Sequence, residues 1–372
     1  MKYVRTHETR DKFLADKDST SRGFRLAPTL YKYSDESEDE DNRDHIYLEL
    51  DDPRKHEGST YMEIALDSDV EFSFYIGNKS GDTQTTMTCT IDWGDDTVET
   101  KTITKDTYGF KLAHNYVAGS YKIELYDVER DYKVVGDDAN TKSLISPRKS
   151  VKRVILGEGV VSIGDWTFYL CTSLTSIFIP KGVTYIGSRT FAGCQLLISI
   201  YIPEGVTSIV HGMFYGCRSL ISVYIPRGVT SIGYTAFDSC RSLTSVYIPE
   251  SVTSIGYTAF GACTSLTSID IPRGVTTINR HTFYNCSFLK SIYLPEGVTT
   301  INRHTFHGCS SLKSIDIPEK VTSIGDSVFE GCSSLTSISS FNPITPHIKP
   351  GATGYDAWLS KLPEGWRIVE DL

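Results

Sequence analysis

Cysteine is the most reactive side chain type in this sequence, and eight of the nine cysteines follow a strict spacing. The series starts at Cys171 and recurs at every 23rd residue up to Cys332. Zinc sites need clustered ligands such as C-x-x-C, which this series lacks. In stacked units, parallel side chains hold their Cβ atoms further apart than a disulfide prefers. We therefore interpret the series as buried free thiols, and Cys89, which lies outside it, as a core residue.

Three carboxylates, Asp92, Asp95 and Asp96, stand close together within residues 91–97. Such a group could bind calcium, but its spacing does not follow the EF-hand pattern. Asp and Gly also build turns without any metal, so a turn is the favoured interpretation. The sequence therefore predicts no metal site.

Two histidines, His281 and His304, occupy the same place in two successive copies of the phrase Ile-Asn-Arg-His-Thr-Phe. With Arg280 and Arg303 beside them, two stacked His-Arg pairs could bind an anion. Local duplication of a solvated face explains the same pattern and is the favoured alternative.

No arrangement of residues in the sequence indicates catalysis. The many serines belong to the repeat, and no P-loop or glycine-rich phosphate cradle follows a predicted strand. We expect no catalytic residues and no cofactor, so the sequence predicts a protein that is not an enzyme.

A column of outward positions carries the most informative variation. A serine lies two residues before each member, from Ser176 to Ser337, and strand alternation puts both columns on one outer face. Tyrosines beside hydroxyls suit sugar rings or a protein partner, whereas stacked tyrosines can also simply stabilise a sheet. Both alternatives stay open. The candidate ligand-binding residues are Phe178, Tyr201, Tyr224, Tyr247, Asp270, Tyr293 and Asp316.

The element that positions this column is a 23-residue unit, whose pattern can be followed in residues 229–249. Leu243, Val246 and Ile248 have the spacing of a short strand with apolar residues inward, and Pro249 ends that strand. Gly233 suits a turn with positive φ. One unit cannot bury its own apolar side chains, so eight stacked units are needed to form a continuous core. The sequence therefore predicts a solenoid over 134–341, with its N-terminal cap, and a C-terminal cap over 342–372.

The residues before the repeats show a different periodicity. Within 61–128, apolar and polar residues alternate as in half-buried strands, which predicts a small β-sandwich over 59–133. Residues 1–58 form a separate α+β unit, with a helix from Thr9 and a strand pair at 30–33 and 45–50. The predicted fold class is mainly β.

Length and charge limit the function classes. A chain of 372 residues with a net charge of −9 lacks the basic surface that nucleic-acid binding needs. No apolar run approaches the ~20 residues that span a bilayer, and residues 1–25 show no secretory signal. We expect neither nucleic acid nor membrane insertion.

Three parts of the chain resemble known families. The blocks S-L-T-S-I-x-I-P, G-V-T-S-I-G and F-x-x-C closely resemble the BspA-type leucine-rich repeat, a family rich in surface adhesins. The segment D-W-G-D-D-T, with H-N-Y and A-G-S-Y, resembles a PKD-type Ig-like domain, which often serves as a spacer. The N-terminal leader, with K-Y-V-R-T-H-E-T at 2–9 and A-P-T-L-Y at 27–31, is similar to leaders of structural proteins of crAss-like Bacteroides phages.

These resemblances imply a phage virion structural protein, such as a head or tail fibre or a decoration protein. Residues 1–58 would dock on other virion proteins, and the solenoid would face a host surface glycan or protein. The alternative is a bacterial cell-surface BspA-like adhesin that binds host protein or glycan. The expected location is accordingly the virion or the bacterial cell surface, and a homo-oligomer is an open alternative to a monomer.

Overall fold

A computed structural model describes residues 30–31, 47–48, 59–78, 82–105, 109–128, 131–135 and 145–340. The chain divides into two compact units, residues 1–55 and residues 56–372. In the first, β1 (Leu30–Tyr31) pairs antiparallel with β2 (Tyr47–Leu48), and both lie within the two segments predicted as strands, 30–33 and 45–50. The predicted helix from Thr9 and the predicted cap at 342–372 lie outside the described residues.

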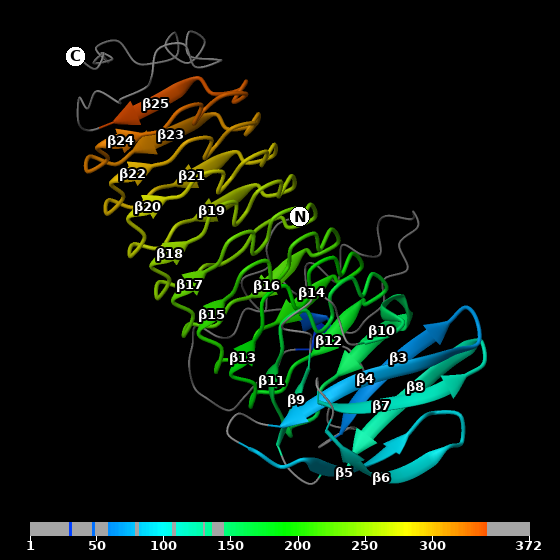
Figure 1. The fold of residues 1–372 in the computed structure, drawn as a ribbon. Helices are drawn as coiled ribbons and strands as arrows, with labels where there is room; N and C mark the ends of the chain where they lie inside the picture. The colour runs from blue at the N-terminus through cyan, green and yellow to red at the C-terminus, as the bar shows by residue number, and fades with distance from the viewer. Residues whose placement is uncertain are drawn as a thin grey trace. The chain divides into compact units, whose positions relative to one another are not determined.

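The second unit begins with β-strands (Figure 1). Strand β5 (Thr86–Asp92) alternates buried and more exposed residues, as the sequence pattern predicts, whereas β4 (Val70–Asn78) is buried on both faces over most of its length. The order β10-β3-β8-β5-β6 forms one sheet, and β9-β4-β7 belongs to another. Both sheets bury apolar faces in one core, which includes Phe72, Phe74 and the fully buried Trp93. The strands are β3 (Thr60–Leu66), β4 (Val70–Asn78), β5 (Thr86–Asp92), β6 (Val98–Thr104), β7 (Phe110–Tyr116), β8 (Gly119–Tyr126) and β9 (Tyr132–Val134).

Both sheets continue without a break into the repeats. A short 3-10 helix, η4 (Arg148–Ser150), leads into β10 (Val151–Ile155), which pairs antiparallel with β3. Strand β11 (Val160–Ile163) pairs parallel with β9. The boundary expected between 133 and 134 therefore lies inside β9, and the N-terminal strands cover the edge of the first repeat.

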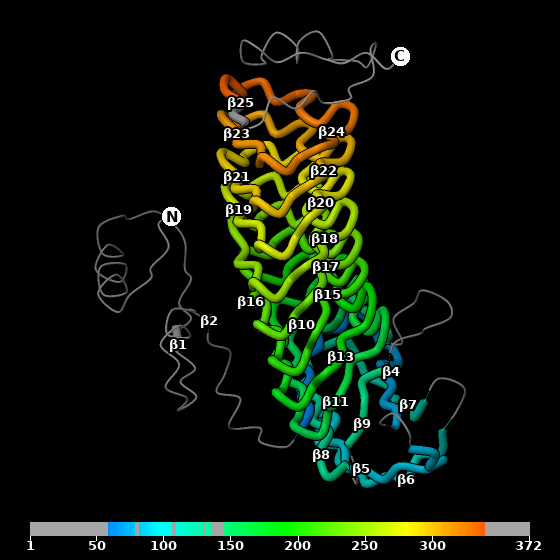
Figure 2. Tube along the Cα trace, turned by 90° about the vertical axis from the view of Figure 1, so that its left-hand side faces the viewer, coloured from blue at the N-terminus to red at the C-terminus, as the bar shows by residue number. Residues whose placement is uncertain are grey.

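The repeats contribute short strands to two columns, and the turns stack along one axis (Figure 2). Where neighbouring strands of a column pair, the pairing is parallel and the register shifts by 23 residues from one turn to the next. After β10, the first column contains β12 (Ser176–Phe178), β14 (Ser199–Tyr201), β16 (Ser222–Tyr224), β19 (Ser268–Asp270), β21 (Ser291–Tyr293), β23 (Ser314–Ile317) and β25 (Ser337–Ser340). After β11, the second column contains β13 (Tyr185–Ile186), β15 (Ser208–Ile209), β17 (Ser231–Ile232), β18 (Ser254–Ile255), β20 (Thr277–Ile278), β22 (Thr300–Ile301) and β24 (Ser323–Ile324).

The prediction of a strand at 243–248 is wrong, although its apolar side chains do point into the core as predicted. Leu243, Val246 and Ile248 are all buried, but residues 243–249 have no strand geometry. The stack persists there because β17 pairs directly with β18 in the second column, and Thr267 N donates to Thr244 O at 3.1 Å.

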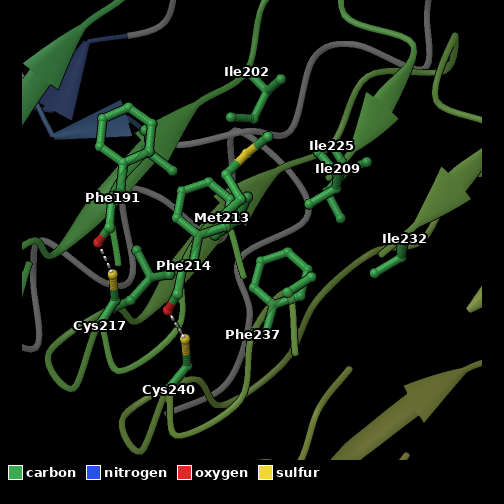
Figure 3. Close-up of a cluster of buried hydrophobic side chains, with 14 of the residues drawn as sticks. Phe191, Ile202, Ile209, Met213, Phe214, Cys217, Ile225, Ile232, Phe237 and Cys240 are labelled. Carbon is green, nitrogen blue, oxygen red and sulfur yellow. Dashed lines mark hydrogen bonds between the residues drawn. The ribbon is translucent and has the colours of Figure 1, made fainter. Parts of the chain in front are cut away.

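The core of the repeats contains a continuous stack of phenylalanine rings. Neighbouring rings from Phe168 to Phe329 have centroids 5.2 to 5.8 Å apart and are nearly parallel. Isoleucines that directly follow the first-column strands, such as Ile202 and Ile225, belong to the same buried cluster (Figure 3). Because every turn contributes the same apolar set, the hydrophobic core runs unbroken from turn to turn.

The prediction of a positive φ at Gly233 is wrong. In this turn, the residues with positive φ come after Gly233. Thr235 and Ser239, two and six residues later, have φ of 51° and 63°. Gly233 is needed instead for close packing, since an added Cβ would lie 2.7 Å from the backbone nitrogen of His211 in the previous turn. Asn279 fills the equivalent position and donates from Nδ2 to Ile255 O at 2.6 Å.

Candidate ligand-binding face

The predicted outward column exists as a physical row along the first strand column. Tyr201 pairs with Tyr224 in register, and Asp270 pairs with Tyr293. The serines two residues earlier align in the same way, as Ser268 does with Ser291. The other members are Phe178 in β12, Tyr247 in the strandless segment and Asp316 in β23.

The N-terminal pair of tyrosines is engaged within the protein. The rings of Tyr201 and Tyr224 stack with centroids 4.9 Å apart and planes 8° apart. The Tyr224 hydroxyl donates to the Glu204 carboxylate at 2.6 Å. Both side chains are half-buried. For these two residues, cross-strand stabilisation accounts for the stacking.

The C-terminal members are much more open to solvent. Tyr247 is 59% exposed and Tyr293 is 54% exposed, and the exposed Asp270 belongs to the turn between them. At ~4.8 Å per turn, the two rings stand about 10 Å apart along the column. Two aromatic rings that flank a carboxylate can stack on apolar surface and accept hydrogen bonds from hydroxyl groups.

A second row of polar and aromatic side chains lies on the loops that follow the second strand column. The imidazoles of His281 and His304 stack with centroids 5.0 Å apart, so the predicted neighbours are indeed in contact. Burial lowers the pKa of His281, and the nearby His304 and Arg303 lower it further. Arg280 lies over the ring of Tyr257, 4.8 Å from its centroid.

The same loops bring together a group that sequence reasoning missed. His304, His307 and Glu330 offer ligand atoms that all lie within 4.8 Å of one another. Two sequence signals could have found it. His304 and His307 have H-x-x-H spacing, and Glu330 lies one 23-residue period after His307.

The three N-terminal aspartates shape a connection between strands, as the turn interpretation predicts. Asp92 Oδ1 accepts from Gly94 N at 2.8 Å, and Asp95 Oδ1 accepts from Thr97 N at 3.2 Å. Asp95 Oδ2 lies 2.7 Å from His114 Nε2. Asp92 and Asp95 therefore each use one carboxylate oxygen to accept the backbone N–H two residues later, as in an Asx turn.

The predicted burial of the cysteines is confirmed for all nine. Burial raises the pKa of Cys171 and Cys217 to about 12, and that of Cys89 to about 11. At neutral pH these thiols stay protonated, which makes them poor nucleophiles and poor metal ligands.

Among the described residues, no helix is both long and apolar enough to cross a membrane. No curated protein matches the chain. Among solved structures, a leucine-rich repeat protein of T. pallidum is 31% identical over 56% of this chain and 84% of its own, with a TM-score of 0.41. A leucine-rich repeat protein from Bacteroides ovatus is 27% identical over 52% and 67%, with a TM-score of 0.36. A leucine rich cell surface protein from Faecalibacterium prausnitzii is 25% identical over 59% and 84%, with a TM-score of 0.28.

The family model for the BspA-type leucine-rich repeat region matches residues 147–267 and 230–349. These two overlapping ranges include every repeat that carries the cysteine series and the outward column. The chain therefore belongs to the BspA-type leucine-rich repeat family.

Proposed function

We propose that this chain is a non-enzymatic binding protein of adhesive type, which holds a surface glycan against the first strand column. The observation that carries the proposal is the exposed group of Tyr247, Asp270 and Tyr293 on successive turns. Exposed aromatic rings on a rigid repeat scaffold lose little conformational entropy when a ligand binds.

The chemistry of this face favours a hydroxyl-rich ligand. Tyrosine rings present an apolar face to the C–H side of a sugar and a hydroxyl at the tip. The Asp270 carboxylate accepts hydrogen bonds from sugar hydroxyls, and the exposed Ser268 and Ser291 hydroxyls lie on the same face. A basic protein segment is the competing ligand, because it would also pair with Asp270.

A glycan array tests this proposal. The full chain should bind a defined subset of glycans, and the double variant Tyr247→Ala/Tyr293→Ala should lose that binding. Phe288→Ala is the matched control, since Phe288 is 59% exposed but lies off the column. Equal binding by the double variant and the wild type would contradict the proposal. Binding only to basic peptides would replace the glycan with a protein partner.

A separate part of the proposal concerns the particle or cell that displays this binding face. Residues 1–58 would anchor the chain to a virion, and the PKD/Ig-like unit at 59–133 would act as a spacer. Supporting this order, the strands of the spacer continue directly into the first repeat. The family membership fits a bacterial cell-surface adhesin equally well.

Particle purification distinguishes a virion protein from a bacterial cell-surface protein. A virion protein should co-purify with phage particles on a density gradient, and deletion of residues 1–58 should abolish its incorporation. A cell-surface adhesin should remain with the bacterial envelope fraction. Retention of the deleted chain on particles at normal occupancy would move the anchor to another segment.

A further inference from the structure

We propose that His304, His307 and Glu330 form a binding site for a divalent transition metal of the zinc class, clamped between two neighbouring turns. Two imidazole nitrogens and a carboxylate oxygen are a donor set that zinc accepts, with the fourth tetrahedral position left to water. The site lies on the loop side of the solenoid and does not depend on the proposed glycan face.

The distances fit a metal of this size. His307 Nδ1 lies 3.5 Å from Glu330 Oε2. Two ligands bound at zinc distances of ~2.1 Å in a tetrahedron stand roughly 3.4 Å apart. All three ligand atoms lie within 4.8 Å of one another, so side-chain rotation alone can close the remaining distances.

The His307 side chain is held in place, but its Nδ1 nitrogen is unpaired. Its Nδ1 atom is buried and has no partner within hydrogen-bond geometry. An unpaired buried polar atom is costly, and a bound cation removes that cost. The ring itself stacks on Tyr284 of the previous turn, with centroids 4.9 Å apart.

Backbone hydrogen bonds fix the two turns that supply the ligands. His304 N donates to Asp326 O at 2.9 Å, and Gly308 N donates to Glu330 O at 2.7 Å. His304 adopts φ of 56°, and His307 N donates back to His304 O at 3.3 Å, so one tight turn presents both imidazoles. The backbone of the site is therefore organised before any metal binds.

Two histidines and a carboxylate on the next turn occur together at one place in the repeat series. The position of His307 is occupied by Tyr215, Asp238, Gly261 and Tyr284 in the four preceding turns. None of those turns pairs two histidines with a carboxylate on the next turn. Within the repeat series this donor set thus occurs once, between the turn that carries Cys309 and the turn that carries Cys332.

Calorimetric titration of Zn²⁺ into the full chain, without a polyhistidine tag, tests the proposal. We expect one zinc per chain and a rise in the unfolding temperature with zinc. His307→Tyr should abolish this binding, with a loss greater than the roughly 10–100-fold that an outer-shell partner costs. This variant restores the residue type of Tyr284, so the turn should fold. Glu330→Gln should also weaken binding, and it keeps the side-chain shape.

His211→Tyr is the matched control, because the next two turns already carry Tyr234 and Tyr257 at that position. It should bind zinc like the wild type. Substitution of Co²⁺ should produce the intense visible absorption of a four-coordinate site without thiolate bands. Absence of zinc binding to the wild type would overturn the proposal. Undiminished binding by both folded variants, His307→Tyr and Glu330→Gln, would also overturn it.

Discussion

The thiol of Cys240 donates a hydrogen bond of 3.1 Å to the carbonyl oxygen of Phe214 in the previous turn (Figure 3). The same carbonyl accepts the backbone N–H of Cys217 at 3.1 Å. This relationship repeats along the solenoid, so the cysteine series joins each turn to its neighbour. The equivalent donor–acceptor pairs are Cys194 to Phe168, Cys217 to Phe191, Cys263 to Phe237, Cys286 to Phe260, Cys309 to Phe283 and Cys332 to Phe306.

Replacement of one of these cysteines should measurably weaken the fold. Cys240→Ala removes a hydrogen bond and a fully buried sulfur atom. We expect the free energy of unfolding to fall by ~1–3 kcal/mol, as for other losses of buried contacts. Urea unfolding followed by circular dichroism measures the change. A loss below about 0.5 kcal/mol, the usual range of surface substitutions, would contradict a structural role for the thiol.

Alkaline pH should destabilise the repeats through the same thiols. Burial raises the pKa of Cys217 from 9.0 to about 12, so the folded chain keeps a proton that the unfolded chain loses. The contribution of Cys217 to stability is complete below pH 9 and declines between pH 9 and 12. The expected slope is about 1.4 kcal/mol per pH unit for each such thiol. Urea unfolding at several pH values should show a slope smaller by that amount in Cys217→Ala; an unchanged slope would refute the assignment.

Core and surface leucines of the repeats should respond very differently to truncation. Leu243 is fully buried, whereas Leu196 is 49% exposed. Leu243→Ala should cost ~2–5 kcal/mol, because it leaves a cavity in the stacked core. Leu196→Ala should change the free energy of unfolding by no more than about 0.5 kcal/mol. Equal effects of the two substitutions would contradict the inward position of Leu243.

The junction between the N-terminal strands and the repeats depends on the hydroxyl of Thr60. Its Oγ1 accepts from Gly157 N at 3.0 Å and lies 2.6 Å from the Tyr132 hydroxyl. Thr60→Val should cost ~1–3 kcal/mol, since it leaves buried donors unpaired. Thr102→Val, on an exposed edge position, serves as the control. Thermal unfolding that is unaffected by Thr60→Val would show that this junction adds little stability.

Two deletions should separate the proposed anchor, residues 1–58, from the strands that cover the edge of the first repeat. Removal of residues 1–58 should leave a folded solenoid, since strands β3 and β9 remain to pair with β10 and β11. Removal of residues 1–134 eliminates both partner strands and exposes two sheet edges, which should cause aggregation or fraying of the first turns. Size-exclusion chromatography and limited proteolysis distinguish these outcomes. A monomeric, protease-resistant chain after the longer deletion would contradict the capping role.

The 23-residue period determined much of this protein without any structure. Stacking identical turns places Phe214 beside Phe237 and Cys217 one turn from Cys240, so the period alone predicted the buried rings and thiols. It also predicted the alignment of Asp270 with Tyr293. These contacts join residues a fixed distance apart in sequence, and repeat stability depends mainly on neighbouring turns.

Tertiary structure alone decided the features that no period describes. The pairing of β3 with β10 joins segments with unrelated sequence patterns, so its register depends on how the N-terminal strands meet the first repeat. Whether a tyrosine of the outward column is stacked, like Tyr201, or exposed, like Tyr247, depends on its packing against neighbours. The 23-residue period places Glu330 one turn after His307, but the direction of both side chains toward the same point depends on the tight turns. Side-chain direction follows from local backbone angles, which sequence spacing does not specify.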